Sequence, residues 1–308
     1  VNNLILFNHQ RYLYDKLEDG KNLSKIIEAN NNNNNTIHSI DLSSKSIYFK
    51  KGGIKNLSKS LIENNSIANL NFSDSEIGKD IDNINSLVEI IRNNKTIENI
   101  FLENNFLWEF LEDLDDLNNL NNKEIENIFK FGFEFNNTII KLSLDYNYLG
   151  GYHKGFSLLC EAINKNKSLR YLSLISIGLG ESKGNLLKFS EIIENDFIKE
   201  LKIDDNFLGF VDFSELKEFF NKIKLSKNLE LLSFNDNRNL LNVKTEEILK
   251  NVFEGNLKIL NFVGISEENN NCFYYDFIDS LKNNKILKEI SLSKFSPFVD
   301  VKEIKGLL

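Results

Sequence analysis

Few residues in this sequence have the types and the spacing that catalysis or metal binding requires. The three histidines, His9, His38 and His153, are scattered along the chain and lack the close spacing of metal ligands. The sequence contains neither the H-E-x-x-H pattern of zinc proteases nor the G-x-x-x-x-G-K-[ST] pattern of phosphate-binding loops. We therefore expect no enzymatic activity and no cofactor.

A group of carboxylates is the best candidate for an ion site. Asp204 and Asp205 are adjacent in sequence, and Asp145 could join them if their strands were neighbours. Hard cations prefer such oxygen ligands, but carboxylates without a defined cage of ligands are usually solvated. The sequence therefore predicts no metal site.

Composition narrows the classes of partner. The chain has 308 residues, a formal net charge of −8 and an isoelectric point near 5.2. Nucleic acids and anionic membrane surfaces attract basic proteins, and the basic residues here form no stripe, so neither is expected as a partner. No run of about 18 apolar residues is present, so no membrane span is predicted. Cys160 and Cys272 are expected to be buried thiols, which fits a reducing, cytoplasmic (intracellular) location.

A repeated strand pattern organises the chain. In Ile139–Gly150, apolar and polar residues alternate as in a half-buried strand, and an asparagine and a Leu-Gly pair follow. Nine such stretches occur, 28–31 residues apart except for one interval of 42 residues, and their fourth and sixth residues are always apolar. The stretches begin at Ile37, Ile67, Ile97, Ile139, Leu169, Ile198, Leu229, Leu257 and Leu287.

Between these strands the apolar residues follow a helical period. Ile84, Leu87 and Ile91, for example, fall on one face of a helix. Several of the helices run into asparagine-rich turns such as Asn93-Asn94. Because asparagine tolerates the left-handed backbone that stops a helix, we expect these asparagines to be left-handed C-caps. Each repeat is therefore strand, turn, helix and turn.

Residues 37–308 resemble leucine-rich-repeat proteins of the ribonuclease-inhibitor-like subclass, most closely over Leu158–Gly180. The resemblance implies an α/β solenoid shaped as a horseshoe, with a concave parallel β-sheet and convex α-helices. It also implies that the asparagine of each turn hydrogen-bonds to backbone groups, so that repeats without it should be less regular. The asparagine stands at Asn105, Asn147, Asn206 and Asn237, and it is replaced at Lys45, Ser75, Ile177, Ile265 and Phe295.

The first 36 residues fit the repeat poorly. We expect them to form an N-terminal cap on the repeat domain of residues 37–308, because the first repeat needs cover for its core. Leu4–Phe7 is a possible strand, and Leu23–Ala29 reads as a short helix with Ile26 and Ile27 inward. The run Asn30–Asn35 is predicted to be a flexible loop that buries nothing.

The long interval contains an insertion near residues 108–120. Insertions in solenoids lie at one edge, often near a binding surface, so Trp108 is a candidate contact residue. The alternative is a longer convex helix. That helix would bury Phe110, Leu111, Leu114 and Leu117.

The third, fifth and seventh residues of each strand pattern should point onto the concave face. Exposed aromatic residues with charged neighbours are typical of interface hot spots, and acidic side chains would favour a basic protein partner. The alternative is an ordinary solvated sheet face. Leu231, Ile259 and Val263 form a second, smaller apolar group on the same face. The candidate binding residues are an acidic row, Glu103, Asp145 and Asp204, and an apolar group, Phe101, Tyr171 and Ile175, with Tyr146 at the rim.

These features predict a non-catalytic protein-binding module, acting as a scaffold, an inhibitor or a sensor surface. The resemblance leaves two other functions open. Ran GTPase-activating proteins belong to the same subclass, but no loop here matches their motif closely enough to assign a residue. Actin-filament regulators of the tropomodulin-like kind share the subclass too.

Overall fold

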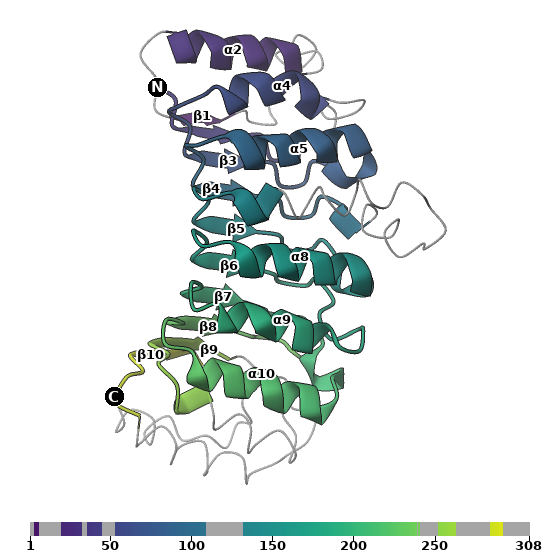
Figure 1. The fold of residues 1–308 in the computed structure, drawn as a ribbon, viewed down its shortest axis with the longest axis vertical. Helices are drawn as coiled ribbons and strands as arrows, with labels where there is room; N and C mark the ends of the chain where they lie inside the picture. Colours follow the sequence, from purple (N-terminus) through teal and green to yellow (C-terminus); the bar gives the residue numbers. More distant parts are fainter. Residues whose placement is uncertain are drawn as a thin grey trace. The chain divides into compact units, whose positions relative to one another are not determined.

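A computed structural model of the chain describes residues 3–5, 20–32, 36–44, 53–108, 132–238, 240, 252–262 and 284–291. The chain forms two compact units, Val1–Arg170 and Tyr171–Leu308. Each is built from short parallel strands that alternate with helices (Figure 1). None of the helices that the structure describes is long and apolar enough to span a membrane.

The elements follow one another in a regular order. In the first unit they are β1 (Asn3–Ile5), α2 (Lys21–Asn32), β2 (Ser39–Asp41), α4 (Gly53–Ile62), β3 (Asn69–Asn71), the 3-10 helix η2 (Ile77–Lys79), α5 (Ile81–Asn93), β4 (Asn99–Phe101), β5 (Lys141–Ser143), the 3-10 helix η3 (Leu149–Gly151) and α8 (His153–Lys165). In the second unit they are β6 (Tyr171–Ser173), α9 (Asn185–Glu194), β7 (Glu200–Lys202), the 3-10 helix η4 (Leu208–Phe210), α10 (Phe213–Leu225), β8 (Leu231–Ser233), β9 (Ile259–Asn261) and β10 (Glu289–Ser291).

The strands pair in the register that the repeat predicts. In the first unit Ile40, Leu70, Ile100 and Leu142 lie side by side across β2 to β5, and all four are buried. The flanking residues of β2, β3 and β4 are half-buried, as the two-residue period of a strand requires. The second unit repeats this register from β6 to β10. The predicted fold class, an α/β leucine-rich-repeat solenoid, is confirmed.

The described helices cover one face of each unit's sheet, and none of them lies on the other face (Figure 1). On α5 the apolar residues Ile84, Leu87 and Ile91 are buried, as the helical period predicts. In α8, Cys160 is buried, also as predicted. We call the face without helices the sheet face.

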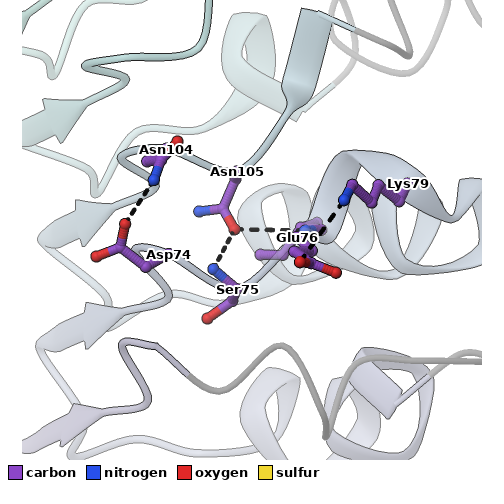
Figure 2. A network of polar contacts seen from close by, with 7 residues as sticks. Asp74, Ser75, Glu76, Lys79, Asn104 and Asn105 are labelled. Atoms are coloured by element: carbon purple, nitrogen blue, oxygen red, sulfur yellow. Dashed lines mark hydrogen bonds and ion pairs between the residues drawn. The ribbon is translucent and has the colours of Figure 1, made fainter.

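A buried asparagine holds each turn to the next. The Asn105 side-chain oxygen accepts the N–H groups of Ser75 at 2.9 Å and Ile77 at 3.3 Å (Figure 2). Its side-chain nitrogen donates to the carbonyl oxygen of Phe72 at 2.8 Å. Asn147 makes the same bonds to the turn of Asn105. The hydrogen bonds that the resemblance implies are therefore present, and they tie successive repeats together.

The residues on either side of this asparagine position share a left-handed backbone. Asp74 and Glu76, for example, have φ angles of 57° and 55°. They flank Ser75, which replaces the asparagine, and Ser176 and Gly178 flank Ile177 in the same way. The backbone of these two turns therefore keeps the left-handed pattern even though the asparagine is absent. The left-handed residues on the two sides are Ser44, Asp74, Asn104, Tyr146, Ser176, Asp205 and Asp236 before the position, and Glu76, Phe106, Tyr148, Gly178 and Phe207 after it.

The asparagines that end the helices are not the left-handed C-caps that we predicted. Asn94, the C-cap of α5, has φ −67° and ψ 143°, which is extended backbone and not left-handed. Its side-chain oxygen accepts the N–H groups of Thr96 and Ile97, both at 2.7 Å, and its nitrogen donates to Leu61 of the preceding helix at 2.7 Å. The asparagine ends the helix because its amide bonds the backbone on both sides of the turn.

The N-terminal region departs from prediction at two points, and the strand predicted within it is present. The helix α2 extends through Asn32, and Asn30 is buried and accepts the N–H groups of Thr36 and Ile37. The predicted loop, Asn30–Asn35, therefore begins too early in the sequence, and the prediction that it buries nothing is wrong. Ile27 is buried as predicted, but Ile26 is 41% exposed. The strand β1 covers Asn3–Ile5 and pairs in register with β2, so this region adds a strand to the sheet.

Several predicted features lie outside the described residues. They are His9, the insertion after Trp108, Val263, Cys272 and the turn positions Lys45, Ile265 and Phe295.

Candidate protein-binding surface

The first unit has an aromatic residue at the centre of its sheet face. Phe101, on β4, lies opposite Ser143 on β5, and its side chain is half-buried. The ammonium nitrogen of Lys141, also on β5, is 5.3 Å from the centre of the Phe101 ring. At this distance the cation is attracted to the ring face, which holds the two side chains together.

The acidic row is less exposed than the sequence predicts. Glu103 is half-buried, and its carboxylate accepts a hydrogen bond from the Ser143 hydroxyl at 2.9 Å. Asp145 is only 7% exposed, so the prediction that it lies on the open face is wrong. Its carbonyl oxygen accepts the N–H group of Asn104, as that of Glu103 accepts the N–H group of Asp74 in the preceding repeat.

Three aromatic rings form a cluster at the carboxyl ends of the strands in the first unit. The Trp108 and Tyr152 rings stack with centroids 6.0 Å apart and planes within 7° of each other. Tyr148 meets Tyr152 edge-on at 6.5 Å. The Tyr148 ring also lies against Gly151, where an added Cβ atom would be 2.7 Å from the ring. We call Trp108, Tyr148 and Tyr152, with the nearby Tyr146, the aromatic edge.

Two tyrosines of the aromatic edge, Tyr146 and Tyr148, are exposed on a fixed backbone. Tyr146 is 57% exposed and Tyr148 is 42% exposed. They flank Asn147, which is fully buried and bonded to two turns, so the backbone beneath them is fixed. Both have positive φ, and this turn geometry directs their rings outward. Sequence analysis found Tyr146 and Trp108 but missed Tyr148 and Tyr152. The sequence does not mark the left-handed turn that exposes Tyr148, because no single residue type is required there.

The remaining predicted residues lie in the second unit. Tyr171, at the start of β6, and Ile175 are half-buried. Asp204 accepts the Ser233 hydroxyl at 2.7 Å and the Asn235 N–H at 2.6 Å. Burial raises the pKa of the Asp204 carboxyl above its ordinary value, although these hydrogen bonds act in the opposite direction. Asp204 thus connects repeats as well as facing solvent.

The structure gives no support for metal or hydrolase chemistry in the part that it describes. Among those residues, no group of three or more His, Cys, Asp and Glu side chains could hold a metal ion. Gly180-Glu181-Ser182-Lys183-Gly184 has the G-x-S-x-G spacing of a nucleophile elbow, a match that our sequence analysis overlooked. An elbow needs its serine on the tight turn between strand and helix, but here a longer loop separates β6 from α9. That loop has a structural role, because the Gly184 N–H donates to the buried Glu215 carboxylate at 3.0 Å.

Comparison with known proteins supports the fold. No protein-family model matches the chain, and no curated protein sequence matches it. The chain is similar to the solved structure of the leucine-rich repeat-containing protein LegL7 from Legionella pneumophila, with 17% identity, a TM-score of 0.50, and coverage of 99% of this chain and 96% of that one. It also matches the tropomodulin C-terminal domain of Caenorhabditis elegans, with 15% identity, a TM-score of 0.38, and coverage of 56% and 92%. The first likeness confirms the leucine-rich-repeat fold, and the second is too weak to add to it.

Proposed function

We propose that this chain is a non-catalytic protein-binding module, and that its first unit binds a protein partner through the aromatic edge and the adjoining sheet face at Phe101. The observation that carries the proposal is the exposure of Tyr146 and Tyr148 on a turn that is already rigid. Tyrosine and tryptophan are enriched among the residues that dominate binding energy at protein interfaces.

Rigidity is what makes this surface suitable for binding. Tyrosine has few rotatable bonds, and the rings of Trp108, Tyr148 and Tyr152 hold one another in place. Little conformational entropy is therefore lost when a partner packs against them. An exposed tyrosine also combines apolar contact area with a hydroxyl that can form a hydrogen bond.

Charge contributes less to this proposal than the sequence predicts. Asp145 is buried and Glu103 is bonded to Ser143, while the basic Lys141 lies on the same face. The exposed carboxylate of Asp74, at the turn edge, is bonded to Asn104 at 2.7 Å. Aromatic contact, and not attraction of a basic partner, is therefore the main support for binding.

The proposal is tested by affinity capture from native lysate with matched variants. Tyr146→Ala/Tyr148→Ala removes the two exposed rings, and Phe210→Ala removes an exposed aromatic ring of the second unit as the control. A partner that the wild type and the control retain should bind the double variant at least about ten-fold more weakly. Equal retention by all three proteins would contradict the proposal.

A further inference from the structure

A groove of about 740 Å³ opens in the first unit, at the amino ends of the strands. It lies at the opposite end of the strands from the aromatic edge. Three consecutive repeats form it, and the bonds from Ile140 N–H to Glu98 at 2.7 Å and from Arg170 N–H to Ile140 at 2.8 Å place their segments side by side. The lining residues are Lys95, Thr96, Glu98, Asn137, Thr138, Ile140, Lys167, Ser168 and Arg170.

The charge of this groove is opposite to that of the chain. Three basic residues, Lys95, Lys167 and Arg170, line it, together with one acidic residue, Glu98. The chain as a whole has a formal net charge of −8. A local concentration of positive charge in an acidic protein favours an anionic ligand at this place.

The groove is built on fixed backbone. The Asn166 side chain accepts the N–H groups of Ser168 at 2.9 Å and Leu169 at 2.8 Å, and donates to the carbonyl oxygen of Phe133 at 2.7 Å. Arg170 Nη1 donates to the carbonyl oxygens of Lys167 and Leu169, both at 2.9 Å. The guanidinium charge is therefore held in position before a ligand arrives, which reduces the entropy lost on binding.

Not all of the lining favours an anion. Glu98 can accept hydrogen bonds and cannot donate them when ionised. The Thr96 hydroxyl donates to the carbonyl oxygen of Asn64 at 3.2 Å, so it offers the groove acceptor lone pairs. A ligand that fits must therefore bring donors as well as negative charge.

We propose that this groove binds an acidic, extended peptide segment of a protein partner. The peptide's carboxylates would meet Lys95, Lys167 and Arg170, and its backbone N–H groups would meet Glu98 and the hydroxyls. Strands lie about 4.8 Å apart, so the positions of Lys95 and Lys167, two strands apart, are separated by about 10 Å. An extended peptide covers that distance in about three residues. A nucleic acid fits less well, because its dense phosphate charge would be repelled by Glu98 and by the acidic chain.

The test uses a short fluorescein-labelled peptide with glutamate at every second position among glycine and serine, so that all its carboxylates lie on one face of the extended chain. Fluorescence anisotropy with the full chain at low salt should detect binding, which added salt should weaken. Lys167→Glu/Arg170→Glu should lower the affinity at least about ten-fold, because it replaces two attractions by repulsions. Lys95→Glu, on the opposite side of the groove, should weaken binding of the peptide as well.

Matched controls separate the groove from a general charge effect. Lys55→Glu makes the same charge change as Lys95→Glu at an exposed position on α4, away from the groove, and should leave the affinity unchanged. The same peptide with glutamine in place of glutamate should not bind. Circular dichroism would establish that each variant is folded.

Several outcomes would overturn the proposal. The wild type could show no binding, or the glutamine peptide could bind equally well. The groove variants could bind the peptide as the wild type does. Tighter binding of a single-stranded oligonucleotide through the same residues would show that the groove binds nucleic acid and not an acidic peptide.

Discussion

At the scale of single residues, the buried turn asparagines contribute to stability through groups on several repeats. Asn147 accepts the N–H groups of Asn105 and Leu107 and donates to the carbonyl oxygens of Leu102 and Leu144. Asn147→Ala would leave these buried groups without partners. We expect a loss of about 3–5 kcal/mol in the free energy of unfolding, measured by denaturant titration.

The control for this substitution is Asn93→Ala. Asn93 is exposed on α5 and donates within its own helix, to the carbonyl oxygen of Glu89 at 3.0 Å. Its replacement should change the free energy of unfolding by no more than about 0.5 kcal/mol. Equal effects of the two substitutions would contradict the role given to the turn asparagines.

Asp204 gives a second prediction at the residue scale, in the dependence of stability on pH. Burial raises the pKa of its carboxyl in the folded state, so the folded chain holds this proton more tightly than the unfolded chain. The stabilisation from this proton is complete below the pKa that the carboxyl has in the unfolded chain. It is lost as pH rises through the pKa that the carboxyl has in the folded chain. Asp204→Asn does not titrate, so its stability relative to wild type should increase from about pH 4 to pH 7.

Thermal unfolding of both proteins at several pH values checks this prediction. The substituted side chain keeps an amide oxygen that can accept hydrogen bonds from Ser233 and Asn235, so the comparison isolates the effect of titration. If the relative stability of Asp204→Asn fell with pH, the hydrogen bonds would outweigh burial.

At the scale of elements, the turn after β5 explains why one position is intolerant of substitution and a nearby position is not, because the left-handed backbone at Tyr146 (φ 59°) ends the two-residue alternation of the strand. Leu144 is fully buried beside β5, whereas Tyr146, two residues later, is exposed. Leu144→Asp should cost more than about 4 kcal/mol, because it places a charge in the core, and Tyr146→Asp should cost less than about 0.5 kcal/mol. Thermal unfolding followed by circular dichroism measures both, and similar melting temperatures would contradict the placement of the turn at Tyr146.

The elements also show what could be predicted from sequence. Strands and helices repeat the same apolar pattern, so their order, register and buried faces followed from periodicity. The burial of Asp145 did not, because its position in the strand pattern predicts an exposed side chain. The exposed ring of Tyr148 was missed because residues of many types occupy the left-handed positions, and the stack of Tyr152 on Trp108 was missed because these residues are far apart in sequence. The basic groove was missed because Lys95 and Lys167 are far apart in sequence and meet only when repeats stack.

At the scale of the whole molecule, the proposals give the first unit two binding surfaces of different chemistry. The aromatic edge, at the carboxyl ends of the strands, offers rigid tyrosine and tryptophan rings. The groove at the amino ends offers fixed positive charge. Both arise because stacked repeats bring equivalent positions into rows, so a few substitutions in neighbouring repeats are enough to build a surface.

The most direct test of the central proposal is site-specific photo-crosslinking in native lysate. A photoreactive phenylalanine analogue would replace Tyr146 on the aromatic edge, and, as a control, exposed Lys25 on α2. We expect one discrete crosslinked protein from position 146 and none from position 25, with the product lost when Tyr148→Ala is added. The same product from both positions, or no product from position 146, would contradict binding at the aromatic edge.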